Sequence, residues 1–281
     1  MTKLVIYTDL DGSLLDHDSY SHVLADALLV ELEAHGIPVI IASSKTRCEQ
    51  IPLRNELGNQ HPFIVENGAA VFMPIGYFEA RPSGTDEDNG YWVKRFSLPR
   101  QHWLEIISDV SADFSGEYTN FDNLDTRQIV ALTGLSEAAA ELAARREFGE
   151  PVHWTGSDKG RQRFIQRLQQ SGAHVLQGGR FLHVSGDCDK GSAMQWLHSR
   201  YAQQPDDRMP ASLAIGDSQN DAAMLEAADY ALIIRSASVA EPTLLRSERT
   251  LRSSKSGPGG WDEGVRKILH SQHLLKDSTN G

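Results

Sequence analysis

Short and almost uninterrupted apolar runs constrain the fold of this chain more than any other feature. They lie at 4–8, 39–42, 63–65, 213–215 and 230–234. An amphipathic stretch from Val23 to His35, followed by Gly36, separates the first two runs and is predicted to be a helix. Strands that are apolar on both faces are typical of parallel sheets covered by helices. The sequence therefore predicts an α/β fold with a Rossmann-like, parallel-sheet core made from the two ends of the chain.

The middle of the chain has a different texture, which predicts an inserted module. Residues 81–91 are rich in Gly, Asp and Ser and are interpreted as a linker. Beyond it we expect helices at 103–112, 137–148 and 161–170, strands at 129–133 and 152–154, and a hairpin of 174–177 with 180–184 around Gly178 and Gly179. The predicted domains are a discontinuous core, residues 1–83 and 187–281, and an α+β cap, residues 84–186.

Composition and charge limit the class of protein. The 281 residues suffice for one large domain or two modest ones, and 40% hydrophobic with 23% charged residues is ordinary for a soluble protein. A net charge of −11 argues against a nucleic-acid-binding protein, which usually carries a basic face. No apolar run approaches the ~18 residues of a membrane helix, and no secretory leader is visible. The chain has only two cysteines, Cys48 and Cys188, so we expect no disulfide framework and a protein of the reducing cytoplasm. The sequence leaves the oligomeric state open.

A pair of carboxylates follows the first apolar run. Asp9 and Asp11 are two residues apart and enter a turn at Gly12. In an extended chain residues i and i+2 point to the same face, so these two side chains can converge where the strand opens into a loop. Such a pair can hold a divalent cation, and one member can attack an electrophile. An Asp-rich turn after a strand fits this stretch equally well when it is considered alone.

A second acidic cluster, with Asp217 and Asp221, follows the apolar run at 213–215. Open parallel sheets bind ligands outside the carboxyl ends of their strands, so Asp9, Asp11 and Asp217 are expected along one edge. Unpaired carboxylates at one edge would repel each other strongly. Mg²⁺ would remove this penalty, because it takes oxygen ligands and keeps waters that a phosphate can replace. The alternative is that Asp217 only caps the following helix.

Two further residues fit an anion site. Ser43 is the first residue after the second apolar run, where hydroxyl and backbone N–H groups at a helix start can hold a phosphoryl oxygen. Lys190 opens another predicted helix, where it can screen a phosphate from the carboxylates and stabilise the transferred charge. An ordinary serine cap and a solvated lysine are the alternative interpretations.

Four motifs of this chain, taken in chain order, resemble those of the haloacid dehalogenase-like phosphatase superfamily. The motifs are Asp9-Leu10-Asp11-Gly12, Ser43, Lys190 and Gly216-Asp217-Ser218-Gln219-Asn220-Asp221. The resemblance implies a phosphoaspartyl mechanism, in which Asp9 attacks phosphorus. Asp11 would protonate the leaving oxygen and then deprotonate the water that hydrolyses the acyl phosphate.

The same resemblance implies a Mg²⁺ cofactor. The ion would sit on the Asp9 carboxylate, the Asp11 backbone carbonyl and Asp217, with Asn220 and Asp221 as supporting groups. The long insert resembles the α/β (C2B-type) cap of the sugar-phosphatase branch, as do Glu66 and Asn67 after the third apolar run. Further stretches resemble the mannosyl-3-phosphoglycerate phosphatase family, namely Ser43–Thr46, Thr133–Ser136, Glu150–Trp154, Gly179–Val184 and Gly257–Trp261.

The family resemblance implies that the substrate is a small phosphorylated molecule, a glycosyl-3-phosphoglycerate, with the mannosyl form as the first candidate. Hydrolysis of that form would give mannosylglycerate, a compatible solute. The core would bind the phosphate, and the cap would supply hydrogen bonds to the sugar and a cation for the carboxylate. The candidate substrate-binding residues are Lys45, Glu66, Asn67, Arg163, Arg180 and His183. Residues 257–260 are expected to form either a backbone cradle or a surface turn.

Three alternatives remain open from the sequence. Within the same fold, the substrate is another sugar phosphate, such as glucosyl-3-phosphoglycerate or sucrose phosphate, or the protein is a phosphomannomutase. The third alternative is a catalytically inactive regulator that binds phosphosugars. A regulator predicts the loss of the nucleophile or of a metal carboxylate, and neither is missing.

Overall fold

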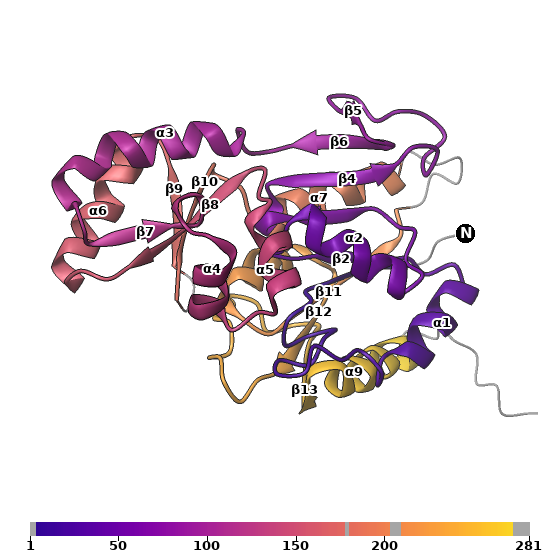
Figure 1. The fold of residues 1–281 in the computed structure, drawn as a ribbon. Coiled ribbons are helices and arrows are strands. Elements are labelled where there is room, and N and C mark those ends of the chain that lie inside the picture. Colours follow the sequence, from indigo (N-terminus) through magenta and orange to yellow (C-terminus); the bar gives the residue numbers. More distant parts are fainter. Residues whose placement is uncertain (1–3, 178–179, 203–208, 272–281) are drawn as a thin grey trace, which may run out of the picture.

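A computed structural model describes residues 4–177, 180–202 and 209–271, and its strands form two sheets (Figure 1). The larger sheet has nine strands in the order β13 (Thr250–Ser256), β12 (Tyr230–Arg235), β11 (Ala211–Gly216), β1 (Leu4–Thr8), β2 (Val39–Ala42), β3 (Phe63–Val65), β4 (Ala70–Pro74), β6 (Tyr91–Arg95) and β5 (Asp86–Asp88). The six strands from β13 to β3 are mutually parallel, and the last three are antiparallel additions. The predicted parallel-sheet core is confirmed.

Each face of this sheet is covered by helices, as the strand composition predicts. Along β1, Leu4 and Ile6 point into one apolar cluster while Val5 and Tyr7 point into the other. Helices α1 (Asp26–Ala34), α2 (Arg47–Glu56) and α9 (Gly257–Ser271) contribute to the first cluster. Helices α7 (Lys190–Tyr201) and α8 (Ala222–Ala227) contribute to the second. Because both faces are buried, the strands carry apolar residues at successive positions.

The smaller sheet is antiparallel, in the order β7 (Tyr118–Asn120), β8 (Gly149–Trp154), β10 (Leu182–Ser185) and β9 (His174–Gln177). Helices α3 (Arg100–Ser111) and α6 (Asp158–Gln170) share an apolar cluster with its strands. Helices α4 (Thr126–Thr133) and α5 (Glu137–Ala144) pack together around Phe121. Short 3₁₀ turns occur at η1 (Glu66–Gly68), η2 (Ala112–Phe114), η3 (Phe121–Asn123) and η4 (Gln219–Asp221).

The strand predicted at 129–133 is wrong, because these residues form the end of helix α4. Asp125 caps the helix and exchanges hydrogen bonds with Gln128 in a capping box, and Gly134 ends it with φ of 80°. The β-branched pair within the stretch favoured a strand, but the two helix-end signals outweigh that preference. Two other expectations also change: the helix predicted to reach residue 148 ends at Ala144, and residues 257–260 begin α9.

The sheets divide the chain later than the predicted boundary at residue 84. The expected linker contains β5, and both β5 and β6 pair within the larger sheet. We therefore propose a cap that begins after β6 and ends with β10. The predicted hairpin turn at Gly178 and Gly179 lies outside the described residues. Within the described part of the chain, no helix combines the length and apolar character needed to cross a bilayer.

Candidate active site

Three neighbouring parallel strands deliver the site residues to one edge of the larger sheet. Strand β1 pairs with β11 at Thr8–Ile215 and with β2 at Thr8–Ile41. Asp9, Asp217 and Ser43 follow the ends of β1, β11 and β2, so they emerge side by side. The Asp9 amide extends the pairing by donating to the Ile215 carbonyl at 2.9 Å. The common edge that the sequence predicts for Asp9 and Asp217 is present.

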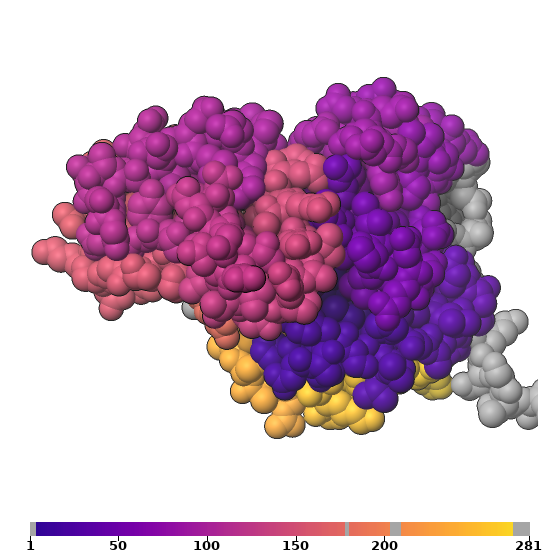
Figure 2. All heavy atoms as spheres, viewed as in Figure 1, coloured from indigo at the N-terminus to yellow at the C-terminus, as the bar shows by residue number. Residues whose placement is uncertain are grey.

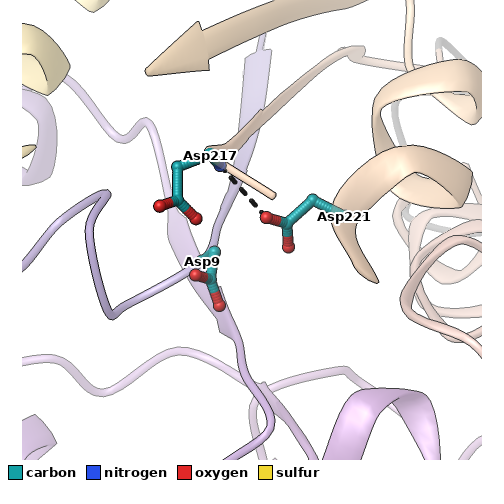
Figure 3. A group of neighbouring side chains, drawn as sticks. All are labelled: Asp9, Asp217 and Asp221. Atoms are coloured by element: carbon teal, nitrogen blue, oxygen red, sulfur yellow. Dashed lines mark hydrogen bonds between the residues drawn. The ribbon is translucent and has the colours of Figure 1, made fainter. Parts of the chain in front are cut away.

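The side chains of Asp9, Asp217 and Asp221 converge at this edge (Figure 3). One carboxylate oxygen from each lies within 4.8 Å of the others, and all three residues are buried. Asp221 Oδ2 also accepts hydrogen bonds from the backbone amides of Asp217, at 3.1 Å, and Ser218, at 3.2 Å. These bonds hold the turn between β11 and α8 around the Asp221 carboxylate.

Two glycines permit this close approach. Gly12 has φ of 80°, and a Cβ atom there would lie 2.4 Å from Asp217 Oδ2. A Cβ atom on Gly216 would lie 2.4 Å from the Cβ of Asp221. Any larger residue at either position would displace a carboxylate of the cluster.

Lys190 lies in the first turn of α7 and neutralises part of the negative charge of the three carboxylates. Its Nζ donates to Asp9 Oδ1 at 2.6 Å and to Asp221 Oδ1 at 2.7 Å, and its side chain is fully buried. Burial by itself would lower the pKa of Lys190, but the charges of Asp221 and Asp9 outweigh burial and hold this pKa above its usual value. The lysine therefore stays charged and fixes the orientation of Asp9.

One lysine does not fully compensate three buried carboxylates. Burial raises the pKa of Asp9 despite the nearby Lys190, and Asp221 raises it further. Burial and the adjacent Asp221 raise the pKa of Asp217 to about 6. A divalent cation between these oxygens would favour their charged forms. The all-oxygen donor set therefore fits a hard cation such as Mg²⁺.

The Asp11 side chain is not part of this cluster and pairs with Lys45 instead. Its Oδ2 lies 2.9 Å from Lys45 Nζ, and Lys45 packs with its Nζ 5.2 Å from the centre of the Tyr20 ring. Asp11 Oδ1 accepts no hydrogen bond from the described residues. The two aspartates of the first motif therefore have different surroundings, which suits different tasks.

A cavity of about 490 Å³ opens beside Asp9, Asp11 and Asp217. This volume is ordinary for a small-ligand site. Its core wall includes Asp9, Asp11, Asn67 and Asp217, while the smaller sheet contributes Leu176, Gln177 and His183. Figure 2 shows the lobe that contains the smaller sheet resting directly against the core lobe. The cavity thus has one wall on each sheet.

Three of the predicted substrate-binding residues reach this region. His183 and Asn67 line the cavity, and Lys45 contacts Asp11. Burial and the nearby Arg146 lower the pKa of His183 to about 4, so its ring is neutral near pH 7. Asn67 also accepts a hydrogen bond from the Asn220 side chain at 3.2 Å, which links two of the predicted motifs.

The other three predicted substrate-binding residues are engaged elsewhere. Glu66 is buried and accepts hydrogen bonds from the amides of Glu147, at 2.8 Å, and Phe148, at 3.3 Å. Arg180 donates to the carbonyl oxygens of Leu132 and Thr133. Arg163, on α6, lies over the Phe114 ring at 5.7 Å. None of these three lines the cavity.

Arg146 is a residue that the sequence did not single out. It follows α5, and its side chain is 8% exposed. Its guanidinium donates to the Ser44 carbonyl oxygen at 3.2 Å, and its Nε lies 3.3 Å from Glu66 Oε2. In the sequence it resembles an ordinary basic residue at a helix end, and no local pattern marks its contact with a loop about a hundred positions earlier.

Comparison with protein families gives two matches. The model of haloacid dehalogenase-like hydrolases matches residues 6–78, which include the first two predicted motifs. The model of sucrose-6F-phosphate phosphohydrolase matches residues 161–267, which include Lys190 and the Asp217 cluster.

Individual proteins match over almost the whole chain. A protein of Methanococcoides burtonii named glucosyl-3-phosphoglycerate/mannosyl-3-phosphoglycerate phosphatase is 32% identical, over 95% of this chain and 97% of that protein. A protein of the same name from Persephonella marina is 34% identical over the same shares. A solved structure from Thermoplasma acidophilum has the same fold, with a TM-score of 0.66 at 19% identity over 98% of this chain and 100% of the other.

Proposed function

We propose that this chain, a phosphoric monoester hydrolase of the haloacid dehalogenase-like family, acts on a glycosyl-3-phosphoglycerate. The mannosyl ester is the first candidate substrate. The single observation that carries the chemistry is the cluster of Asp9, Asp217, Asp221 and Lys190, of which Asp9 and Asp217 line the cavity. The substrate class is supported by two relatives of that name that match end to end. The product would be mannosylglycerate, a compatible solute.

The first step we propose is attack by an Asp9 carboxylate oxygen on the phosphorus atom. The P–O bond to the glycerate breaks as the new bond forms, which gives an aspartyl phosphate and releases the sugar-bearing alcohol. Lys190 orients Asp9 through Oδ1, which leaves Oδ2 without a bond to the lysine. Ser43 would hold a non-reacting phosphoryl oxygen from the adjacent strand end.

Asp11 would manage the proton in both steps. Its Oδ1, which accepts no hydrogen bond from the described residues, would give a proton to the leaving glycerate oxygen. It would then take a proton from the water that attacks phosphorus in the second step. That attack cleaves the acyl phosphate, frees the Asp9 carboxylate and yields inorganic phosphate.

Mg²⁺ is the cofactor we propose, held by the carboxylates of Asp9 and Asp217 and by the backbone carbonyl of Asp11. Asn220 and Asp221 would support these ligands. When bound, the ion would neutralise charge on the phosphoryl oxygens. The chain's own contribution is the fixed donor set, and the raised pKa values of Asp9 and Asp217 support a cation at this position.

A second candidate substrate is sucrose phosphate, which the match of residues 161–267 to the sucrose-6F-phosphate phosphohydrolase model favours. Those residues include part of the cap, where His183 and Gln177 line the cavity. The end-to-end relatives favour the phosphoglycerate ester more strongly, because they match the cap as a whole. We also propose a cytoplasmic location, which fits two cysteines that form no disulfide.

The test is phosphate release from purified protein across a panel of substrates. The panel contains mannosyl- and glucosyl-3-phosphoglycerate, sucrose phosphate, and mannose and glucose phosphates, each with Mg²⁺ and with EDTA. We expect the highest kcat/KM for mannosyl-3-phosphoglycerate and no release in EDTA. A higher kcat/KM for sucrose phosphate would overturn the substrate proposal, and interconversion of hexose phosphates without phosphate release would indicate a mutase.

A further inference from the structure

Resting on the proposed function, we propose that Lys45 binds the carboxylate of the substrate's glycerate group and so determines the preference for phosphoglycerate esters. A phosphoglycerate ester differs from an ordinary sugar phosphate by this carboxylate. The site therefore needs a cation close to the reacting phosphate, and Lys45 meets that requirement.

The position of Lys45 follows from its contact with Asp11. Lys45 Nζ lies 2.9 Å from Asp11 Oδ2, while Oδ1 of the same carboxyl group accepts no hydrogen bond from the described residues. If Oδ1 serves the leaving oxygen, the ammonium group and the leaving oxygen lie on either side of one carboxyl group. The Lys45 side chain is 15% exposed and the Asp11 side chain is 36% exposed, whereas the Asp11 Oδ1 atom is buried, so the carboxyl group has to rotate before Oδ1 can meet a ligand.

The chemistry of the substrate places its carboxylate in the same region. In a 3-phosphoglycerate ester, only two carbon atoms separate the leaving oxygen from the carboxylate carbon. With bonds of about 1.5 Å, the carboxylate oxygens lie within about 5 Å of the leaving oxygen. A group bound at Asp11 through its leaving oxygen therefore brings its carboxylate within reach of Lys45, as a charge-assisted hydrogen bond requires.

The Lys45 backbone is held firmly, which suits a recognition role. Its amide donates to Ser43 Oγ at 3.2 Å. Its carbonyl oxygen accepts hydrogen bonds from the Glu66 amide at 3.1 Å and from the Gln50 side chain at 3.3 Å. These contacts tie the lysine to the same loop that presents Ser43, so a shift of one would move the other.

Among the described residues, His17 is another basic residue that lines the cavity, whereas the remaining basic candidates are occupied or remote. Lys190 is fully buried between Asp9 and Asp221. Arg146 bonds the Ser44 carbonyl oxygen and lies against Glu66. The neutral ring of His183 suits a hydroxyl of the sugar better than a carboxylate. Arg163 and Arg180 are engaged on the cap side. Lys45, like them, does not line the cavity, but it contacts Asp11, which does.

The experiment compares two substrates that differ only in the carboxylate: mannosyl-3-phosphoglycerate and 2-O-mannosylglycerol 3-phosphate. We measure kcat/KM with Mg²⁺ for the wild-type protein, Lys45→Gln and Lys45→Arg. Loss of a hydrogen bond to a charged group lowers kcat/KM by about ten- to a hundredfold. In Lys45→Gln, kcat/KM for mannosyl-3-phosphoglycerate should therefore fall by this factor relative to kcat/KM for 2-O-mannosylglycerol 3-phosphate. Lys45→Arg should retain most of the wild-type preference for the first substrate.

Two outcomes would overturn the role of Lys45. An equal loss on both substrates would show that Lys45 only positions Asp11. A loss of preference in Arg146→Gln, with the preference intact in Lys45→Gln, would place the carboxylate site in the cap. Failure of the proposed function gives a different result, because the wild-type protein itself would then prefer a substrate without the glycerate group.

Discussion

The two walls of the cavity are built in different ways. On the core wall, Asp9 accepts a hydrogen bond from Lys190, which lies behind the wall and also bonds Asp221. On the cap wall, Leu176, Gln177 and His183 lie on neighbouring strands β9 and β10, and none of them is ionised. The acidic groups that line the cavity therefore include the core residues Asp9 and Asp217, while the cap residues that line it are neutral.

The division has a physical reason. A charged cluster needs fixed partners, because an unpaired buried charge is costly, and strand ends in a parallel sheet supply them. A sugar offers hydroxyl groups, which neutral donors and acceptors can bind without that cost. Substitutions on one side of the cavity at a time test this contrast.

Asp9→Asn should give the largest effect, because it removes the proposed nucleophile and leaves the side-chain volume almost unchanged. We expect kcat for phosphate release to fall at least about a thousandfold, with little change in substrate affinity. Phosphate release and isothermal titration with substrate measure the two quantities. A variant that keeps a tenth of the wild-type kcat would exclude covalent catalysis by Asp9.

Lys190→Met should mainly affect stability. It leaves Asp9 and Asp221 buried without their cation, and breaking a buried ion pair in this way costs about 3–5 kcal/mol. Urea unfolding in EDTA measures the loss. The double variant Lys190→Met with Asp221→Asn serves as the control and should recover part of it. A loss under about 1 kcal/mol would mean that the core charges are solvated rather than mutually compensated.

His183→Gln should alter how stability depends on pH. In the folded protein the pKa of His183 is about 4, whereas an unfolded histidine has its ordinary value near 6.5. Between these values only the unfolded chain binds the proton, so this group costs stability as the pH falls from about 6.5 to 4. The variant should lose less stability over that range, by on the order of 2 kcal/mol, in urea unfolding at a series of pH values. Parallel curves for the two proteins would contradict a neutral, half-buried His183.

Arg146→Met should have the smallest effect on the chemistry. It removes the hydrogen bond to the Ser44 carbonyl oxygen, which joins the cap to the loop after β2. We expect KM to rise by about tenfold with kcat changed less, because the cap would dock less firmly. Steady-state kinetics separate the two constants, and Arg146→Lys is the matched control. A fall in kcat at constant KM would instead assign Arg146 to the chemical step.

The sequence allowed the core wall to be predicted, because its residues are marked locally. Asp9, Ser43 and Asp217 each follow an apolar run, and Lys190 follows a capping residue, so chain order alone indicated their meeting point. The cap wall lacked such marks. Arg146 and Ser44 are 102 positions apart, and only the folded packing brings them together. The two β-branched neighbours at 129–130 favour a strand, whereas the capping box of Asp125 and Gln128 begins helix α4.

The most direct test of catalysis by the core wall is to trap the phosphoryl group on the protein. Asp11→Asn keeps Asp9 but lacks the base for the second step, and acetyl phosphate, whose leaving group needs no proton, serves as the donor. After an acid quench, peptide mass spectrometry should find one phosphoryl group on Asp9, and none in the variant that also carries Asp9→Asn. Phosphate release by Asp11→Asn with no label on Asp9, or with a label on another residue, would contradict the proposed chemistry.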